Sequence, residues 1–392
     1  MDFEKYDVVI VGGGPSGFIT GENIKNKKVL VLEEHQEIGV PLQCAGLLSK
    51  KCIKELGNPK GSVNKVRGAH IYSKNSSITV GNEEIRAEVF ERKIMDKDIA
   101  TRASKNVDVL LKSYGKIKNS NNSKNQDKNK HKLEIRHMDE TFEVSPKIII
   151  GADGIRSTIG RSLNMIDKKR EIISGVQIEF VNAEIDDDFV HVIYDKRYSE
   201  KFFTWVIPLG NDRVRVGMCD SNNSYKKLMD FLENNKIAKE ILKNATPVEF
   251  ICGAIPIGYS KTVNNNVMLV GDSAGQVKPL SGGGLYYGAK CGKICADTIN
   301  QYFEGNYDVE FLKSYEKNWK SEIASEIDKN LKIRKILNML NNDKMDRIFD
   351  FINKNNLVEF INEKGDMDNP STVVKPILDR VLFGKIEKIN RK

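Results

Sequence analysis

The chain has 392 residues, which is enough for two or three domains that each bury a hydrophobic core. Hydrophobic residues make up 40% of it, and no run reaches the roughly 20 apolar residues that span a bilayer, so a membrane-spanning helix is excluded. The net charge is +8, from 62 basic and 54 acidic residues. These charges are dispersed and form no recognised nucleic-acid-binding module, so nucleic acid is not expected as a partner.

The charge and the first residues bear on the location of the protein. The basic excess is either a solvated lysine surface or an attraction to an anionic partner such as a phospholipid surface. The N-terminal segment runs directly into an apolar strand without the flanks of a signal peptide, so we expect a cytoplasmic protein, peripheral at a membrane under the second interpretation. The six cysteines form no CxxC pair and no His/Cys cluster, and no metal site is predicted.

The first 33 residues predict a strand, a glycine loop, a helix and a second strand. Gly12, Gly14 and Gly17 satisfy the G-x-G-x-x-G spacing at the point where the strand ends and the helix opens. In such a loop the first glycine permits a tight turn, the second lets the backbone approach a pyrophosphate, and the third lets the helix pack on the strand. Glu33 ends the second strand, where an acid binds ribose hydroxyls, and its neighbour Glu34 is the alternative. The pattern predicts a dinucleotide site.

Further along, residues 68–82 predict a hairpin and residues 92–104 a helix. The polar segment 116–132 lies between two predicted strands, which indicates an exposed hairpin tip. Residues 170–256 show mostly strand alternation, interrupted by one amphipathic helix over 224–244, and the last 90 residues have a helical pattern.

The fold class we predict is therefore α/β: an FAD-binding Rossmann-type domain, an inserted antiparallel sheet domain that binds substrate, and a C-terminal helical region. We assign 1–65, 86–165 and 257–300 to the discontinuous FAD-binding domain. We assign 66–85 and 166–256 to the sheet domain, and 301–392 to the helical region.

The choice of FAD depends on motifs after the glycine loop. Asp272 ends a predicted strand in "NVMLVGDSAG" and is followed by a glycine-rich turn and a long helix from Leu285. Asp153 lies in "GADGIRS", and Arg92 in "FERKIMDKDIA". In this order the motifs resemble the flavoprotein family typified by p-hydroxybenzoate hydroxylase. The resemblance implies that Asp272 binds the ribityl chain, that Arg92 lies near the phosphates or the ribityl chain, and that the helix dipole favours the anionic reduced flavin.

Two further segments, "GVPLQCAGLLS" and "GDSAGQVKPLSGGGLYYG", are similar to the geranylgeranyl reductase branch of that family and to its archaeal digeranylgeranylglycerophospholipid reductases. The likeness covers nearly the whole chain. By position it implies an FAD site lined by Ser16, Glu33, Cys44, Ala45, Leu47, Arg92, Asp272, Gly284 and Leu285, with Tyr114 as the adenine-side contact.

The same branch carries a P-x-x-Y-x-W-x-F-P segment thought to shape a lipid cavity. Here the segment is "EKFFTWVIP", in which Trp205 matches while Phe203 and Ile207 replace the family's Tyr and Phe. The lost tyrosine hydroxyl puts any hydrogen bond from that position in doubt. These three alternating side chains are either a substrate wall or one core face of a strand.

The resemblance implies an FAD-dependent reductase that saturates geranylgeranyl chains of archaeal ether lipids, by protonation of the alkene and hydride transfer from flavin N5. The lipid and an electron donor (ferredoxin, reduced flavin or NADPH) are the implied partners, because no second G-x-G-x-x-G unit supplies a nicotinamide domain. The catalytic acid is not assigned. Trp205 is a candidate for stabilising positive charge, and Cys44 is either a proton-handling or redox thiol or a small contact residue.

Other functions remain open at this point. "FTWVIP" approaches the W-x-W-x-I-P segment of flavin-dependent halogenases, which makes a monooxygenase or halogenase the main alternative. An electron-transfer flavoprotein acting on a quinone usually adds an iron–sulfur domain, for which the cysteines are lacking. A non-catalytic FAD or lipid carrier would bind flavin without turnover.

Overall fold

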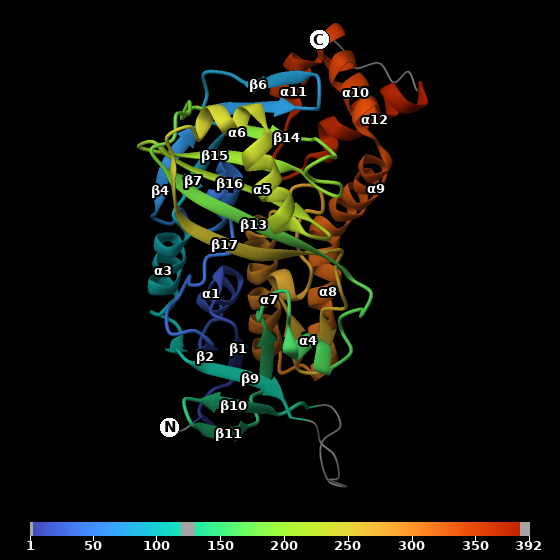
Figure 1. Ribbon diagram of the computed structural model, residues 1–392. Coiled ribbons are helices and arrows are strands. Elements are labelled where there is room, and N and C mark those ends of the chain that lie inside the picture. The colour runs from blue at the N-terminus through green and yellow to red at the C-terminus, as the bar shows by residue number, and fades with distance from the viewer. Residues whose placement is uncertain (1–2, 119–129, 385–392) are drawn as a thin grey trace.

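The computed structural model describes residues 3–118 and 130–384 (Figure 1). In Figure 1 the helices near the N-terminus and those that directly follow residue 284 lie in the lower half. A large sheet crosses the upper half, and the C-terminal helices lie beside its upper end. This arrangement confirms the predicted fold class, an FAD-binding α/β domain with a further sheet and C-terminal helices. The domain boundaries that we assigned from the sequence stay a prediction.

A six-stranded sheet forms the centre of the lower half. Its four inner strands are short apolar runs buried on both faces, as expected of a parallel sheet covered on two sides. All neighbours pair in parallel except the first two in the spatial order. That order is β18 (Val263–Asn264), β19 (Val267–Leu269), β12 (Ile148–Gly151), β1 (Val8–Val11), β2 (Val29–Leu32) and β8 (Asp108–Leu110).

Alternate residues of these strands point to two separate cores. One core is shared with helices, namely α1 (Pro15–Glu22), α2 (Lys50–Glu55), α3 (Arg92–Ala103), α7 (Leu285–Glu304), η2 (Val309–Leu312), α8 (Lys313–Trp319) and the π-helical turn η3 (Lys320–Ala324). The other core is shared with α4 (Thr158–Ser162) and a three-stranded antiparallel sheet, β9 (Ser113–Ile117), β10 (Leu133–His137) and β11 (Glu140–Val144). The hairpin tip predicted within 116–132 falls largely on 119–129, outside the described residues.

The upper half is a seven-stranded sheet that is antiparallel except for one parallel pair, β14 with β5. Its strands, in spatial order, are β17 (Thr246–Ile257), β13 (Glu171–Val181), β16 (Arg213–Asp220), β15 (Thr204–Gly210), β14 (Phe189–Ile193), β5 (Gly68–Tyr72) and β6 (Ser77–Gly81). β5 and β6 form the predicted hairpin. A small sheet of β3 (Leu47–Ser49), β7 (Ala87–Phe90) and β4 (Ser62–Val66) packs against the large sheet.

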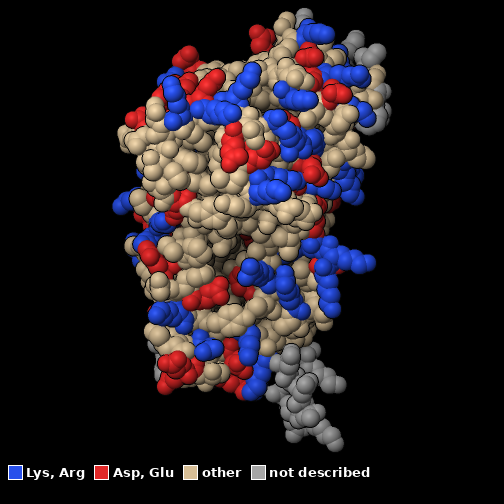
Figure 2. Space-filling view, viewed as in Figure 1, with Lys and Arg blue, Asp and Glu red and all other residues tan. Residues whose placement is uncertain are grey.

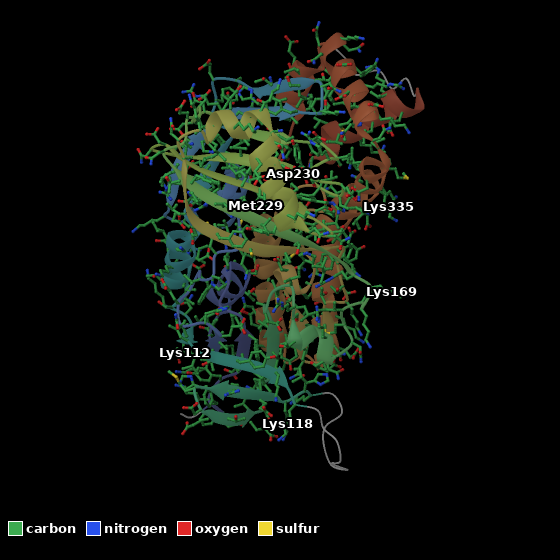
Figure 3. The ribbon with its side chains drawn as sticks, viewed as in Figure 1. Lys112, Lys118, Lys169, Met229, Asp230 and Lys335 are labelled. Atoms are coloured by element: carbon green, nitrogen blue, oxygen red, sulfur yellow. The ribbon has the colours of Figure 1, made fainter. Side chains whose placement is uncertain are left out.

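Two helices cover the outer face of the large sheet, and Met229 on the first of them lies in front of the strands in Figure 3. They are α5 (Ser224–Asn234) and α6 (Lys236–Ile241). The prediction of one helix over 224–244 was therefore wrong. The Asn235 side chain accepts hydrogen bonds from the N–H groups of Ile237 and Ala238, and this N-cap begins a second helix where the first one ends.

The C-terminal region is helical, as predicted, and packs on the β6 edge of the large sheet. It comprises α9 (Ser325–Met339), α10 (Asn342–Lys354), α11 (Leu357–Lys364) and α12 (Ser371–Phe383). No helix of the described ranges is long and apolar enough to cross a membrane. Basic and acidic side chains are interspersed over the face seen in Figure 2.

A buried ionic cluster joins the large sheet to the lower half of the molecule. Arg215 of β16 is fully buried, and its guanidinium donates to Glu179 of β13 at 3.0 Å and to Glu91, just before α3, at 2.9 Å. The same guanidinium donates to the carbonyl oxygens of Ala45 at 3.2 Å and Phe90 at 3.4 Å. One side chain thus fixes the position of the 44–46 loop relative to the sheet.

We expect Arg215→Met to lower the free energy of unfolding by about 3–5 kcal/mol, because it leaves buried carboxylates and carbonyls without their partner. Arg213 binds the same Glu179, but it is 34% exposed, so Arg213→Met should cost only about 1 kcal/mol. Urea unfolding of both variants followed by circular dichroism measures the difference. Equal losses of unfolding free energy in the two variants would mean that Arg215 does not hold the 44–46 loop to the large sheet.

Candidate functional site

The glycine loop between β1 and α1 has one open and two crowded positions. Gly12 has φ +113°, and a Cβ atom there would lie 2.2 Å from the carbonyl oxygen of Ala152. A Cβ on Gly17 would lie 2.2 Å from the carbonyl oxygen of Gly12. A Cβ on Gly14 would have no protein atom within 4 Å, and Gly14 lines the main cavity. The crowded glycines therefore build the turn, while Gly14 leaves space for a ligand.

The start of α1 is suited to an anion. Gly14 precedes the helix without a side-chain cap and Pro15 occupies its first turn, so backbone N–H groups are free to face the cavity. Ser16 lines the cavity as well. A Cβ on Gly271 or Gly288 would lie within 2.5 Å of Ser16 Oγ, so these glycines let the Asp272 loop and α7 close onto α1.

Glu33 is held at the end of β2. Its carboxylate accepts hydrogen bonds from the N–H groups of Gly13 at 3.0 Å and His35 at 2.9 Å, and His35 Nδ1 lies 2.6 Å away. Glu33 is 9% exposed and lines the cavity, whereas the side chain of Glu34 is 62% exposed and does not. Of the two acids, the structure brings Glu33 to the glycine loop.

Asp272 and the start of α7 form the opposite wall. Burial raises the pKa of Asp272, although Arg92 and Arg170 act in the other direction. A Cβ on Gly284 would lie 2.7 Å from Asp272 Oδ1, so glycine is needed there for the carboxyl to face the helix start. Gly284 and Leu285 both line the cavity, and no side chain caps α7.

The 44–47 loop supplies a third wall, with Cys44, Ala45 and Leu47 all facing the cavity. Arg92 pairs with Asp96 through two hydrogen bonds of 2.9 Å and lies beside the sulfur of Cys44. Burial opposes the charge of Arg92, but Asp96 and Cys44 outweigh it, so the pKa of Arg92 lies above its usual value. The guanidinium is thus a permanent cation next to the thiol.

The cavity continues from these walls along the large sheet, with a volume of about 850 Å³. Phe203, Trp205 and Ile207 line it. Trp205 donates from Nε1 to Gln177 Oε1 at 3.2 Å, and Gln177 Nε2 donates to the carbonyl oxygen of Cys44 at 3.1 Å. A chain of hydrogen bonds therefore connects β15, which carries Trp205, to the loop that carries Cys44.

Four predicted cofactor residues are not among the lining residues, namely Gly12 and Gly17, which build the turn of the glycine loop, and Tyr114 and Asp153. Tyr114 lies on β9, opposite Arg136 of β10. Asp153 accepts hydrogen bonds from Ser157 Oγ at 2.6 Å and from the N–H of Ile159 at 3.1 Å, so it stabilises the start of α4. Its neighbours Ala152 and Gly154 do line the cavity. Contacts of Tyr114 and Asp153 with the cofactor stay predictions.

Sequence reasoning missed the far wall of the cavity, which comes from the C-terminal helices. Their apolar lining residues are Leu337, Met345, Ile348, Phe349, Ile352, Ile361, Val373, Val374, Ile377 and Leu378. It also missed the buried ion pair of Lys278 with Asp368, at 2.9 Å. The sequence shows the helical periodicity of the C-terminal region, but it does not show that the apolar faces of these helices line the cavity.

These walls fit an FAD. Space at Gly14 and free N–H groups at α1 suit the pyrophosphate, Glu33 suits the ribose hydroxyls, and Asp272 suits a polyol. Within the described ranges, no group of three or more His, Cys, Asp or Glu side chains is placed to hold a metal ion.

The glycine loop provides a direct test of this assignment. Gly14→Ala should weaken FAD binding at least tenfold, because its Cβ enters the ligand space, yet it should change the unfolding free energy of the FAD-free chain by only about 1 kcal/mol or less. Gly12→Ala should destabilise the FAD-free chain by about 2 kcal/mol or more, from its positive φ and its clash. FAD titration and urea unfolding measure both quantities. Unchanged FAD affinity in Gly14→Ala would contradict the assignment.

Comparisons with known proteins agree with this geometry. Residues 5–325 match the family model described as FAD binding domain. An uncharacterized protein of Methanocaldococcus jannaschii is 56% identical over 98% of this chain and 97% of its own length. The digeranylgeranylglycerophospholipid reductase of Methanococcus vannielii is 33% identical over 81% of this chain and 82% of its own length.

Among solved structures, a geranylgeranyl bacteriochlorophyll reductase-like protein from Thermoplasma acidophilum superposes with a TM-score of 0.83 at 26% identity, covering 97% of this chain and all of its own. A flavin-dependent brominase superposes with a TM-score of 0.71 at 18% identity, which shows the shared fold alone. The chain is an FAD-dependent oxidoreductase, and it belongs to the family of FAD-binding flavoproteins that includes the archaeal digeranylgeranylglycerophospholipid reductases.

Proposed function

We propose that the protein saturates the carbon–carbon double bonds of geranylgeranyl chains in a glycerol ether phospholipid, giving an archaeol-type lipid. The observation that carries this proposal is the continuous cavity. It begins at the FAD walls, passes Phe203 and Trp205, and ends among the apolar side chains of the C-terminal helices. An apolar space of this kind suits polyprenyl chains and does not suit a small polar substrate. The names of the relatives support the same substrate class.

The chemistry requires both a proton and a hydride, because isolated alkenes offer no electrophilic carbon. Bound FAD in its reduced form supplies hydride-transfer chemistry. The apolar walls keep water away from the positive charge that develops on the alkene, and the ring of Trp205, held through Gln177, is available for cation–π stabilisation.

We propose Cys44 as the proton source. Cys44 lines the cavity, and the guanidinium of Arg92 lies beside its sulfur, so the proton would leave next to a permanent cation. The alternative is that Cys44 is only a small contact residue of the cofactor. In that case a variant without the thiol would keep its turnover rate.

The electron donor is proposed to be a ferredoxin, a reduced flavin or NADPH acting transiently. The sequence contains one G-x-G-x-x-G unit, at Gly12–Gly17, so no second nucleotide-binding unit of this type would hold a nicotinamide. A cytoplasmic location with peripheral contact to a membrane surface is proposed as well, since the substrate is a membrane lipid.

The lining of the cavity also contains a candidate contact for the phosphate of the lipid. Three lysine or arginine side chains line it. Arg92 pairs with Asp96 and Lys278 pairs with Asp368. Arg86 has no carboxylate within 4.0 Å among the described residues. Its N–H donates to the carbonyl oxygen of Val66, and Val66 and the adjacent Ala87 are apolar lining residues. Of the three cations that line the cavity, Arg86 is therefore the one without a carboxylate partner, and it is available to bind the phosphate of the lipid.

Arg86→Gln should raise KM for digeranylgeranylglycerophospholipid at least tenfold and leave FAD content unchanged. It should leave KM for the uncharged digeranylgeranylglycerol unchanged, because that substrate has no phosphate to bind. Arg67→Gln is the matched control, since Arg67 lies nearby but is paired with Glu83 and Asp188. Equal effects on the two substrates would exclude a phosphate contact.

The first test of the function itself is anaerobic. We expect the dithionite-reduced holoenzyme, mixed with digeranylgeranylglycerophospholipid, to increase the lipid mass in steps of two hydrogen atoms, with reoxidation of the flavin. Mass spectrometry of the lipid and the visible absorbance of the flavin follow the two events. An unchanged lipid, with flavin that stays reduced until oxygen enters, would instead support a monooxygenase or halogenase.

A further inference from the structure

A buried ion pair adjoins the cavity through Lys278 and has no role in the function proposed above. Lys278 Nζ lies 2.9 Å from Asp368 Oδ1 and donates to the carbonyl oxygen of Met367 at 3.1 Å. The side chains are 10% and 1% exposed. Asp368 also accepts a hydrogen bond from Ser49 Oγ, and its carbonyl oxygen accepts one from Tyr287. Moving two charges out of water costs free energy, and well-packed apolar residues at the same positions would avoid this cost. The pair is therefore not explained by stability alone.

The pair adjoins the turn that opens α7. Lys278, Gly282, Gly283 and Gly284 all line the cavity. A Cβ on Gly283 would lie 2.7 Å from Lys278 Cε and 3.2 Å from Lys278 Nζ. The ammonium group therefore stands against the uncapped start of a 20-residue helix, and both place positive potential on the same wall.

FAD carries negative charge in two places when it is reduced. The pyrophosphate is always anionic, and the glycine loop at the start of α1 accounts for it. Uptake of two electrons and one proton from an external reductant adds one negative charge to the isoalloxazine ring. The second helix start in this cavity, at α7, is then available to that ring.

We propose that Lys278 and Asp368 together set the reduction potential of the bound flavin. Lys278 stabilises the anionic reduced form relative to the oxidised form, and Asp368 limits this stabilisation by partly neutralising Lys278. This inference depends on FAD binding and not on the identity of the lipid. Because Asp368 lies in the connection between α11 and α12, it also makes the potential depend on the position of the C-terminal helices.

The two charges predict shifts of opposite sign. Lys278→Met should lower the two-electron midpoint potential by at least about 30 mV, which corresponds to a tenfold loss in the preference for reduced over oxidised FAD. Asp368→Asn should raise the potential by a similar amount, because it leaves the cation without its partner. The double variant should return toward the wild-type value. Anaerobic reduction of each holoenzyme against a dye of known potential measures these shifts.

Two controls separate this role from a structural one. Lys51→Met breaks the neighbouring Lys51–Asp366 pair, whose lysine side chain is 62% exposed, and should leave the potential unchanged. Lys278→Arg keeps the cation and should stay near the wild-type potential. If Lys278→Met loses FAD during purification, the ratio of Kd values for added oxidised and reduced FAD gives the same shift. Shifts of the same sign in the Lys278→Met and Asp368→Asn variants, or no shift in either, would overturn the proposal.

Discussion

The buried guanidinium of Arg215 is the contact on which the geometry of the site depends. It is fully buried and holds two carboxylates and two backbone carbonyls from separate parts of the chain. The loop that carries Cys44 and Ala45 is thereby fixed to the large sheet, and Gln177 adds a second connection from the same sheet. The wall that carries Trp205 and the wall that carries Cys44 can then face one cavity with a constant separation.

The parts of the site that sequence predicts well are those in which one residue type is required by local geometry. Gly12 and Gly17 are crowded by backbone atoms, so only glycine fits, and the spacing is visible without the fold. Asp272 is fixed by a strand end and by the glycine that follows at 284. Asn235 carried a local signal of this kind, a polar N-cap within an apparently continuous helix, but the apolar periodicity on both sides concealed it.

The parts that sequence did not predict depend on residues distant along the chain. Lys278 and Asp368 are separated by 90 positions, and neither stands in a motif that specifies its partner. The direction in which the C-terminal helices bury their apolar faces depends on the β6 edge, which comes from residues 77–81. These helices also lie beyond residue 325, where the match to the FAD-binding family model ends. The apolar far wall of the cavity therefore lies in a region that the family model does not describe.

The continuity of the cavity has a consequence for the chain before it acquires its cofactor. The apolar compartment between the large sheet and the C-terminal helices is continuous with the walls assigned to FAD, so one cavity serves both. FAD binds the folded chain, so at a free concentration 100 times its Kd it adds about 2.7 kcal/mol to the free energy of unfolding. Most single domains are stable by only about 5–15 kcal/mol. The free energy of unfolding, and with it the fraction of unfolded chain open to proteolysis, therefore depends on the concentration of free FAD.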